Sequence, residues 1–323
     1  MNTKSNATST PPPYPMLAAF GKARSWIREV SALAAIPILL VALSIVGNVY
    51  LQRTAYVYLL FLTMSQAWNI IMLSGRVNLG QFIFYATGGY ALALLLNLGI
   101  PLVLCVLAGG VFALALALLC SPLLRLRGIF FAIITLFLPM LFRAFVLLTP
   151  TITGGASGVF QSVNPHPFIM DYYMMLTIAV LATGLNLFLA HSKYRLALNA
   201  MHDDEDVALA MGVNVLGSRV LCFSISAFIS GVAGALYTYS LPYVDTSFLL
   251  STEDNILMIT MSTIGGIRDV WGPVVGALLS FLFEYARIAF PYVHLVISGV
   301  ILIAATLFVP GGIMQYLRKL QTK

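Results

Sequence analysis

The chain has 323 residues, of which 60% are hydrophobic and only 9% are charged, and its mean hydropathy is +0.95. Soluble domains carry about 25% charged residues, so this composition excludes an ordinary soluble protein and predicts a chain embedded in lipid. The 17 Lys and Arg outnumber the 11 Asp and Glu. They stand singly or in pairs at the ends of apolar segments, which is the pattern of membrane proteins rather than of a nucleic-acid surface.

The sequence gives no indication of an enzyme or of a metal site. The three cysteines all fall within apolar segments, and the four histidines are scattered without ligand spacing. There is no Walker loop, no nucleophile elbow and no paired His-Glu metal motif. We therefore expect this chain to have no catalytic residue, to hold no metal and to bind no cofactor of its own.

Ten apolar segments predict an all-α polytopic membrane protein with about ten transmembrane helices, within a range of eight to ten. They are residues 31–51, 54–73, 79–98, 102–124, 128–148, 172–190, 220–241, 255–267, 270–290 and 294–309. The eighth segment is short, because about 13 helical residues rise only ~20 Å against a hydrocarbon core of ~30 Å. We expect it to be a half-helix completed by irregular backbone at Ile264–Ile267, buried within the protein.

Three regions follow from this pattern. Residues 1–30 are predicted to form a cytoplasmic tail with an interfacial helix around Leu17–Val30, residues 31–312 the transmembrane domain, and residues 313–323 a basic cytoplasmic tail. Placing both termini inside the cell puts most of the Lys and Arg in the cytoplasm. The same orientation puts the longest polar interval, residues 192–217, on the cytoplasmic side.

The densest patch of charge between the first and last spans is Asp203–Gly212, which reads DDEDVALAMG. Asp203 is predicted to cap a short helix, and Gly212 to end it in a left-handed conformation, before a second short helix from Val213. Such a helix suits docking to a soluble partner, although an ordinary solvated loop would have the same composition. The candidate docking residues are Asp203, Asp204, Glu205, Asp206, Ala208, Ala210 and Gly212.

This loop resembles a known family. Asp206-Val207-Ala208-x-x-x-Gly212 is similar to the acid-Ala-Ala-x3-Gly cytoplasmic loop of ABC importer permeases. The longer run from Arg195 to Asn214 resembles the form in LivM-type branched-chain amino acid permeases. Val207 replaces the first alanine, and the Leu-Pro that often follows in other permease families is absent, which suits the LivM branch. Four further stretches resemble the same family in the same order, namely residues 73–90, 126–136, 153–158 and 264–276.

The resemblance implies a permease subunit of an ABC importer in the bacterial inner membrane. Its implied partners are a second related permease, two ATP-binding subunits that hold ATP-Mg, a periplasmic binding protein and membrane lipid, and not nucleic acid. Selectivity in such systems resides largely in the binding protein. The cargo therefore stays open between branched-chain amino acids, other amino acids, urea and short amides. An ion-coupled secondary transporter and a structural or assembly protein are the alternatives from other classes.

Polar side chains at membrane depth are costly and become candidates for the substrate pathway. These candidates are Gln66, Asn69, Asn78, Gln81 and Arg143. The four amides would equally suit hydrogen bonds to neighbouring backbone where helices break. Glu284 and Arg287 are three residues apart, and we expect them to pair with each other.

Glycines within the apolar segments are expected to let helices approach closely or to break them where polar backbone is needed. The candidates for such breaks or contacts are Gly80, Gly88, Gly89, Gly265, Gly266, Gly272 and Pro273. A further stripe of small residues at positions 230, 231, 234 and 235 predicts a contact between helices.

Overall fold

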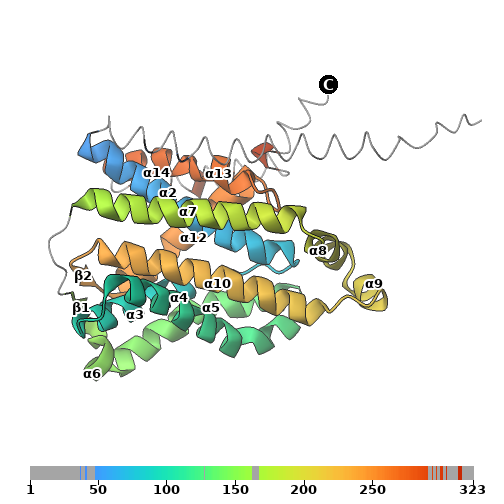
Figure 1. Ribbon diagram of the computed structural model, residues 1–323, viewed down its shortest axis with the longest axis horizontal. Coiled ribbons are helices and arrows are strands. Elements are labelled where there is room, and N and C mark those ends of the chain that lie inside the picture. The colour runs from blue at the N-terminus through green and yellow to red at the C-terminus, as the bar shows by residue number, and fades with distance from the viewer. Residues whose placement is uncertain are drawn as a thin grey trace, which may run out of the picture.

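The computed structural model describes residues 48–126, 128–161 and 167–289, together with isolated positions at 37, 41, 293, 296, 299, 300, 303 and 312–314. The predicted N-terminal tail, most of the predicted first and last spans and residues 315–323 of the predicted C-terminal tail lie outside the described residues. The described chain is almost entirely helical, and its long helices run side by side along the long axis of the molecule (Figure 1).

The helices follow the apolar segments of the sequence. In chain order they are α2 (Val49–Leu73), α3 (Phe82–Asn97), α4 (Leu102–Cys120), α5 (Ile129–Leu148), α6 (Pro150–Thr153), α7 (Phe168–His191), α8 (Tyr194–Asp203), α9 (Glu205–Ala210), α10 (Val215–Tyr239), α11 (Thr246–Leu249), α12 (Thr252–Gly265), α13 (Gly272–Ala277) and α14 (Leu279–Ala289). Two short 3₁₀ turns, η1 (Ser121–Arg125) and η2 (Gly155–Ser157), and two strands, β1 (Val159–Phe160) and β2 (Tyr243–Val244), complete the described elements.

Five helices among the described residues are long and apolar enough to cross a membrane: α2, α4 with η1, α5, α7 and α10. The shorter apolar helix α3 lies between the first two in the chain. Almost all of α2 is buried and most of α10 is, whereas α4 and α5 keep most of their apolar side chains exposed. Exposed apolar helix faces are stable only against lipid or another apolar surface, so α2 and α10 form the centre and α4 and α5 the periphery.

Small residues allow the central helices to pack with their backbones in contact. A Cβ atom added at Gly88 of α3 would overlap the carbonyl of Gly231 in α10, and one at Gly234 would overlap the carbonyl of Tyr85. On its other side, Gly231 faces Gly109 of α4. The predicted small-residue stripe is therefore the contact by which α10 joins α3 and α4.

Two segments of irregular backbone interrupt the helices within the bundle. The predicted third span begins only at Phe82, because residues 74–81 form turns and irregular backbone between α2 and α3. The predicted ninth span is divided, since α13 ends at Ala277 and α14 starts at Leu279. The segment between α12 and α13, residues 266–271, is also irregular. We call these two irregular segments the 74–81 break and the 266–271 break.

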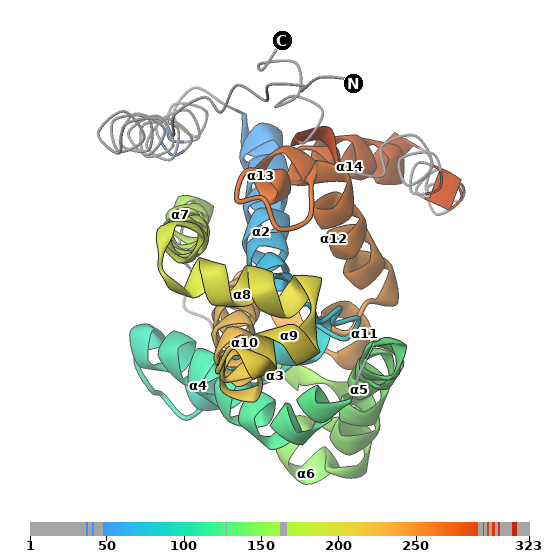
Figure 2. The same ribbon diagram turned by 90° about the vertical axis from the view of Figure 1, so that its right-hand side faces the viewer.

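The two ends of the bundle differ in structure (Figure 1). At one end, β1 pairs antiparallel with β2, with Val159 opposite Val244, and this pair joins the α5–α7 and α10–α11 connections. At the other end lie α8 and α9, which fold across the ends of the long helices (Figure 2).

The predicted first span was wrong at its boundary, because Val49–Leu51 belong to α2.

Candidate functional site

The polar interval of the sequence folds into two short helices, α8 and α9, and a turn at Gly212. We call residues 194–212 the docking segment. The predicted cap was wrong by one position: Asp203 is the last residue of α8, and Asp204 caps α9 by accepting the amide protons of Asp206 and Val207 at 2.9 and 3.1 Å. Capping by the second aspartate allows the chain to reverse between the two helices.

Gly212 ends α9 as the sequence predicts. Its φ is +81°, and its amide donates to the carbonyl of Leu209 while the next amide, of Val213, donates to that of Ala208, both at 3.0 Å. These two bonds form the Schellman arrangement, which favours glycine at the left-handed position. The predicted second short helix from Val213 is instead the start of α10, which begins at Val215 after its cap Asn214.

The two faces of α9 have different surroundings. Ala208 is fully buried against the bundle, and its small side chain lets the helix lie close to α10. Val207, Leu209 and Met211 are about half or more exposed, and Ala210 is exposed as well. An exposed apolar face next to acidic side chains is typical of a surface that meets another protein.

Glu205 is not part of the exposed face, because its carboxylate binds two arginines of the bundle. Arg219 of α10 donates to it through both terminal nitrogens at 2.7 and 2.9 Å, and Arg76 of the 74–81 break lies at 3.4 Å. Both arginine side chains are about 95% buried, whereas that of Glu205 is 25% exposed. A paired buried charge of this kind holds its elements together, since losing one partner leaves the other charge uncompensated.

The α8 part of the docking segment is attached to the 266–271 break. Arg268 donates to the amide oxygen of Asn199 at 2.7 Å, and Arg195 donates to the carbonyl of Arg268 at 2.9 Å. Leu198 and Met201 of α8 are buried below these contacts. The docking segment is thus joined to α10, to the 74–81 break and to the 266–271 break.

The four amide side chains predicted at membrane depth lie at these two breaks. Gln66 donates to the carbonyl of Val270 at 3.0 Å, and Asn69 both donates to the carbonyl of Asp269 and accepts from the amide of Arg268. These bonds satisfy backbone groups that have no helical partner.

The 74–81 break is satisfied in the same way. The side chain of Asn78 accepts from the amide of Gly80 at 3.0 Å and donates to Gln81 at 2.6 Å. Gln81 in turn donates to the hydroxyls of Ser226 and Ser230 in α10 at 2.8 and 2.6 Å. Polar side chains therefore hold the broken backbone against α10.

Comparison with known proteins bears on this architecture. The family model described as branched-chain amino acid transport system / permease component matches residues 50–306, about four fifths of the chain. This range contains both breaks and the docking segment. The chain belongs to this permease family.

Individual relatives agree with the family assignment. The chain is similar to the high-affinity branched-chain amino acid transport system permease protein LivM of Salmonella typhimurium, with 26% identity over 84% of this chain and 71% of that protein. It is similar to LivM of Escherichia coli, with 24% identity over 91% and 77% of the two chains. A probable branched-chain amino acid transport permease protein LivH of Methanocaldococcus jannaschii matches with 31% identity over 42% and 45%. No solved structure matches.

These results make the chain a multi-pass membrane protein of the LivM type and a permease component of an ABC transport system. The prediction that Gln66, Asn69, Asn78 and Gln81 belong to a substrate pathway stays a prediction. In this conformation of the permease they are fully or almost fully buried and bonded to protein. Arg143, the fifth candidate, is exposed on α5, and its place in a substrate pathway stays a prediction as well.

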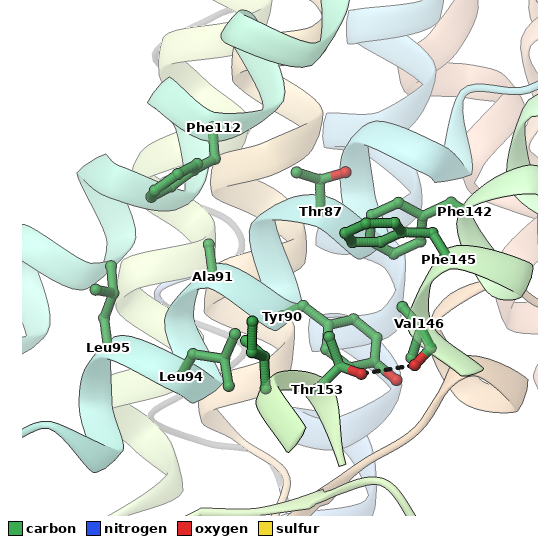
Figure 3. Close-up of a pocket in the computed structure, with 11 residues that line it drawn as sticks. Thr87, Tyr90, Ala91, Leu94, Leu95, Phe112, Phe142, Phe145, Val146 and Thr153 are labelled. Atoms are coloured by element: carbon green, nitrogen blue, oxygen red, sulfur yellow. Dashed lines mark hydrogen bonds between the residues drawn. The ribbon is translucent and has the colours of Figure 1, made fainter. Parts of the chain in front are cut away.

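One cavity in the permease, of ≈ 260 Å³, is apolar. It lies between α3, α4 and α5, where Phe142 and Phe145 face Thr87 and Tyr90 (Figure 3). The Thr87 hydroxyl donates to its own helix backbone, at 2.7 Å from the carbonyl of Ile83. This cavity suits an apolar group such as a lipid chain and offers no charge to a zwitterion.

A second cavity contains the charged residues of α14. The predicted ion pair between Glu284 and Arg287 is absent: among the described residues, no contact of 4.0 Å or less joins them. Both side chains instead line a cavity that they share with Asp254 of α12. Sequence spacing placed the two charges on one helix face, but it could not indicate that a cavity lies between them.

Proposed function

We propose that this permease is one membrane-spanning subunit of an ATP-driven importer that carries branched-chain or other amino acids across the bacterial inner membrane. It acts with a second permease of the same family, two ATP-binding subunits that hold ATP-Mg, and a periplasmic binding protein. Membership of the permease family supports this role. The LivM relatives are named as permeases of branched-chain amino acid transport systems, which supports the choice of substrate class.

The docking segment is the observation that carries the coupling part of the proposal. Its outward face presents Val207, Leu209 and Met211 beside exposed aspartates, which suits a groove on an ATP-binding subunit. Its inward face is fixed to the bundle through Glu205. A movement of the partner would therefore be transmitted through Glu205 to α10 and to the 74–81 break.

Because the docking segment contacts the two breaks, a movement of the partner would reach backbone that can rearrange. Irregular segments lack the continuous hydrogen-bond ladder of a helix, so they are positions where backbone can rearrange. Arg268 joins α8 to the 266–271 break. In the proposed cycle, ATP binding and hydrolysis by the partners shift the docking segment and thereby reorient the helices on either side of the two breaks.

Reconstitution tests the proposal. The complex that purifies with the tagged chain is placed in liposomes, and uptake of labelled leucine is followed with the binding protein outside and ATP inside. We expect uptake that requires ATP and that persists when a protonophore removes the proton gradient. Uptake driven by a proton gradient without ATP would contradict the proposal in favour of an ion-coupled transporter. Uptake of urea or a short amide in place of leucine would correct the substrate.

A further inference from the structure

The cavity beside Glu284 and Arg287 has the chemistry of a binding site for a small zwitterion. It measures ≈ 130 Å³ and lies among α2, α3, α10, α11, α12 and α14. Two carboxylates, Asp254 and Glu284, and one guanidinium, Arg287, line it. Leu60 and Phe61 of α2 line it as well, so that charged groups and an apolar wall meet in one space.

The charged groups around this cavity are not saturated by one another. Among the described residues, Arg287 makes no ion pair of 4.0 Å or less with Asp254 or with Glu284. Charged side chains within membrane segments normally pair, because leaving them unpaired in a low dielectric is costly. Arg287 is exposed and the two carboxylates are half-buried, so the three charges surround the space without closing it and leave room for partners from outside the protein.

A second observation points in the same direction. The hydroxyl of Ser280 in α14 is buried, with 2% of the residue exposed, and it has no hydrogen-bond partner. It lines a small adjoining cavity of ≈ 20 Å³, which shares Asp254, Glu284 and Arg287 with the larger one. Buried hydroxyls are normally bonded, so this space also needs a polar group from a ligand or from water.

We propose that this cavity binds the transported amino acid during its passage. Arg287 contacts the α-carboxylate, Asp254 and Glu284 contact the ammonium group, and the α2 wall of Leu60 and Phe61 receives the branched aliphatic side chain. This assignment rests on the proposed function, and it names where the permease itself recognises its cargo.

The combination of charges selects among the candidate cargoes. A ligand with a single charge would pair either with Arg287 or with the two carboxylates and leave the other group without a partner. Urea or a short amide, which carries no charge, would form an ion pair with neither. The space is smaller than the ~300 Å³ of the smallest pockets for drug-sized ligands, which suits a single amino acid. The apolar wall favours an aliphatic side chain over a polar one.

The position of the cavity fits a step early in import. Tyr237, another lining residue, lies two residues before the end of α10, close to β2 and opposite the end with the docking segment. In the predicted orientation this is the outer half of the membrane. The amino acid would reach this cavity before it passes the two breaks.

Direct binding tests the proposal without the binding protein. The purified complex is titrated with L-leucine, with 3-methylbutylamine, which lacks the carboxylate, and with 4-methylpentanoate, which lacks the ammonium group. We expect saturable leucine binding that is weaker by about tenfold or more in Arg287→Gln, Asp254→Asn and Glu284→Gln, as for a lost hydrogen bond to a charged group. Arg287→Gln should leave binding of the amine unchanged, and Glu284→Gln should leave binding of the acid unchanged.

Arg125→Gln is the matched control, because it removes an exposed arginine of η1 that does not line the cavity. Arg287→Lys keeps the charge and should retain part of the affinity, which separates recognition from misfolding. The proposal is wrong if wild-type complex shows no saturable leucine binding, or if all three variants bind leucine like the control. These results are distinguishable from failure of the proposed function, which would appear as a loss of ATP-dependent uptake by the wild type in liposomes.

Discussion

Replacing Glu205 with glutamine removes the charge that fixes α9 to the bundle and keeps the volume of the side chain. Arg219 and Arg76 would then lose the Glu205 carboxylate while their guanidinium groups stay buried. Removing one partner of a buried ion pair costs ~3–5 kcal/mol. Because the side chain of Glu205 is 25% exposed, we expect a smaller loss, about 2–3 kcal/mol after solvent screening. That loss raises the equilibrium constant for detachment of α9 roughly 30- to 150-fold.

Hydrogen exchange measures this detachment directly. The amides of Ala208, Met211 and Val213 donate within α9 and its terminal turn, so their exchange reports opening of the docking segment. We expect their protection to fall in Glu205→Gln by the factor given above, while amides in the centre of α2 stay protected. Asp203→Asn is the matched control, because it removes an exposed acid at the end of α8 and should change stability by less than about 0.5 kcal/mol.

A double substitution refines the test. If Glu205 and Arg219 act as a pair, the combined loss in Glu205→Gln/Arg219→Gln should be smaller than the sum of the single losses, because the second substitution removes the charge that the first leaves uncompensated. Equal protection in Glu205→Gln and Asp203→Asn would refute the reasoning, and so would strictly additive losses in the double variant.

Three further predictions concern the turn, the helix contact and the breaks. Gly212→Ala and Gly99→Ala should each lower the free energy of unfolding by ~1–2 kcal/mol through left-handed strain alone, because both glycines have positive φ and no atom lies within 4 Å of an added Cβ. Only Gly212→Ala should also lower ATP-driven uptake. Equal uptake by the two variants would argue against coupling through this turn. Gly88→Ala should lower the midpoint of thermal unfolding by the equivalent of ~1–3 kcal/mol, because the added Cβ meets the α10 backbone. Gly299→Ala is the control: its added Cβ meets open space, so the midpoint should stay unchanged. Gln66→Leu should lower the unfolding midpoint by the equivalent of ~1–3 kcal/mol, and an unchanged KM for leucine would indicate a purely structural role. A changed KM at unchanged stability would support the prediction that Gln66 belongs to the substrate pathway.

Hydrophobic runs were enough to place most of the described long helices. α4, α5 and α7 lie within a few residues of the predicted spans, because a membrane helix needs a continuous apolar stretch and little else. The boundaries were less certain where polar residues continue a helix. α10 starts at Val215, inside the predicted polar interval, because Asn214 caps it and the first turn can be polar.

Contacts across long distances in the sequence could not be predicted. The pairing of Glu205 with Arg76 joins positions 129 residues apart, and nothing in the local pattern distinguishes Glu205 from the exposed aspartates beside it. The sequence offered backbone bonding as an alternative for Gln66 and Asn69. Only the fold shows that the 266–271 break supplies that backbone.

The short strands were missed for a related reason. β1 and β2 contain two residues each, which is too few for a periodic pattern, and they pair across more than 80 positions. The helix α8 was missed because its buried residues, Leu198 and Met201, stand among polar ones in a segment that composition marks as a loop.

The most direct test of the account asks which side of the membrane presents α9 and what covers it there. Leu209→Cys places a thiol on the exposed face of α9, in a background where the three native cysteines are replaced. A membrane-impermeant maleimide should label it in inside-out vesicles stripped of ATP-binding subunits, and rebinding of those subunits should protect it. Labelling in intact spheroplasts, or labelling that the ATP-binding subunits leave unchanged, would contradict the role of the docking segment in coupling.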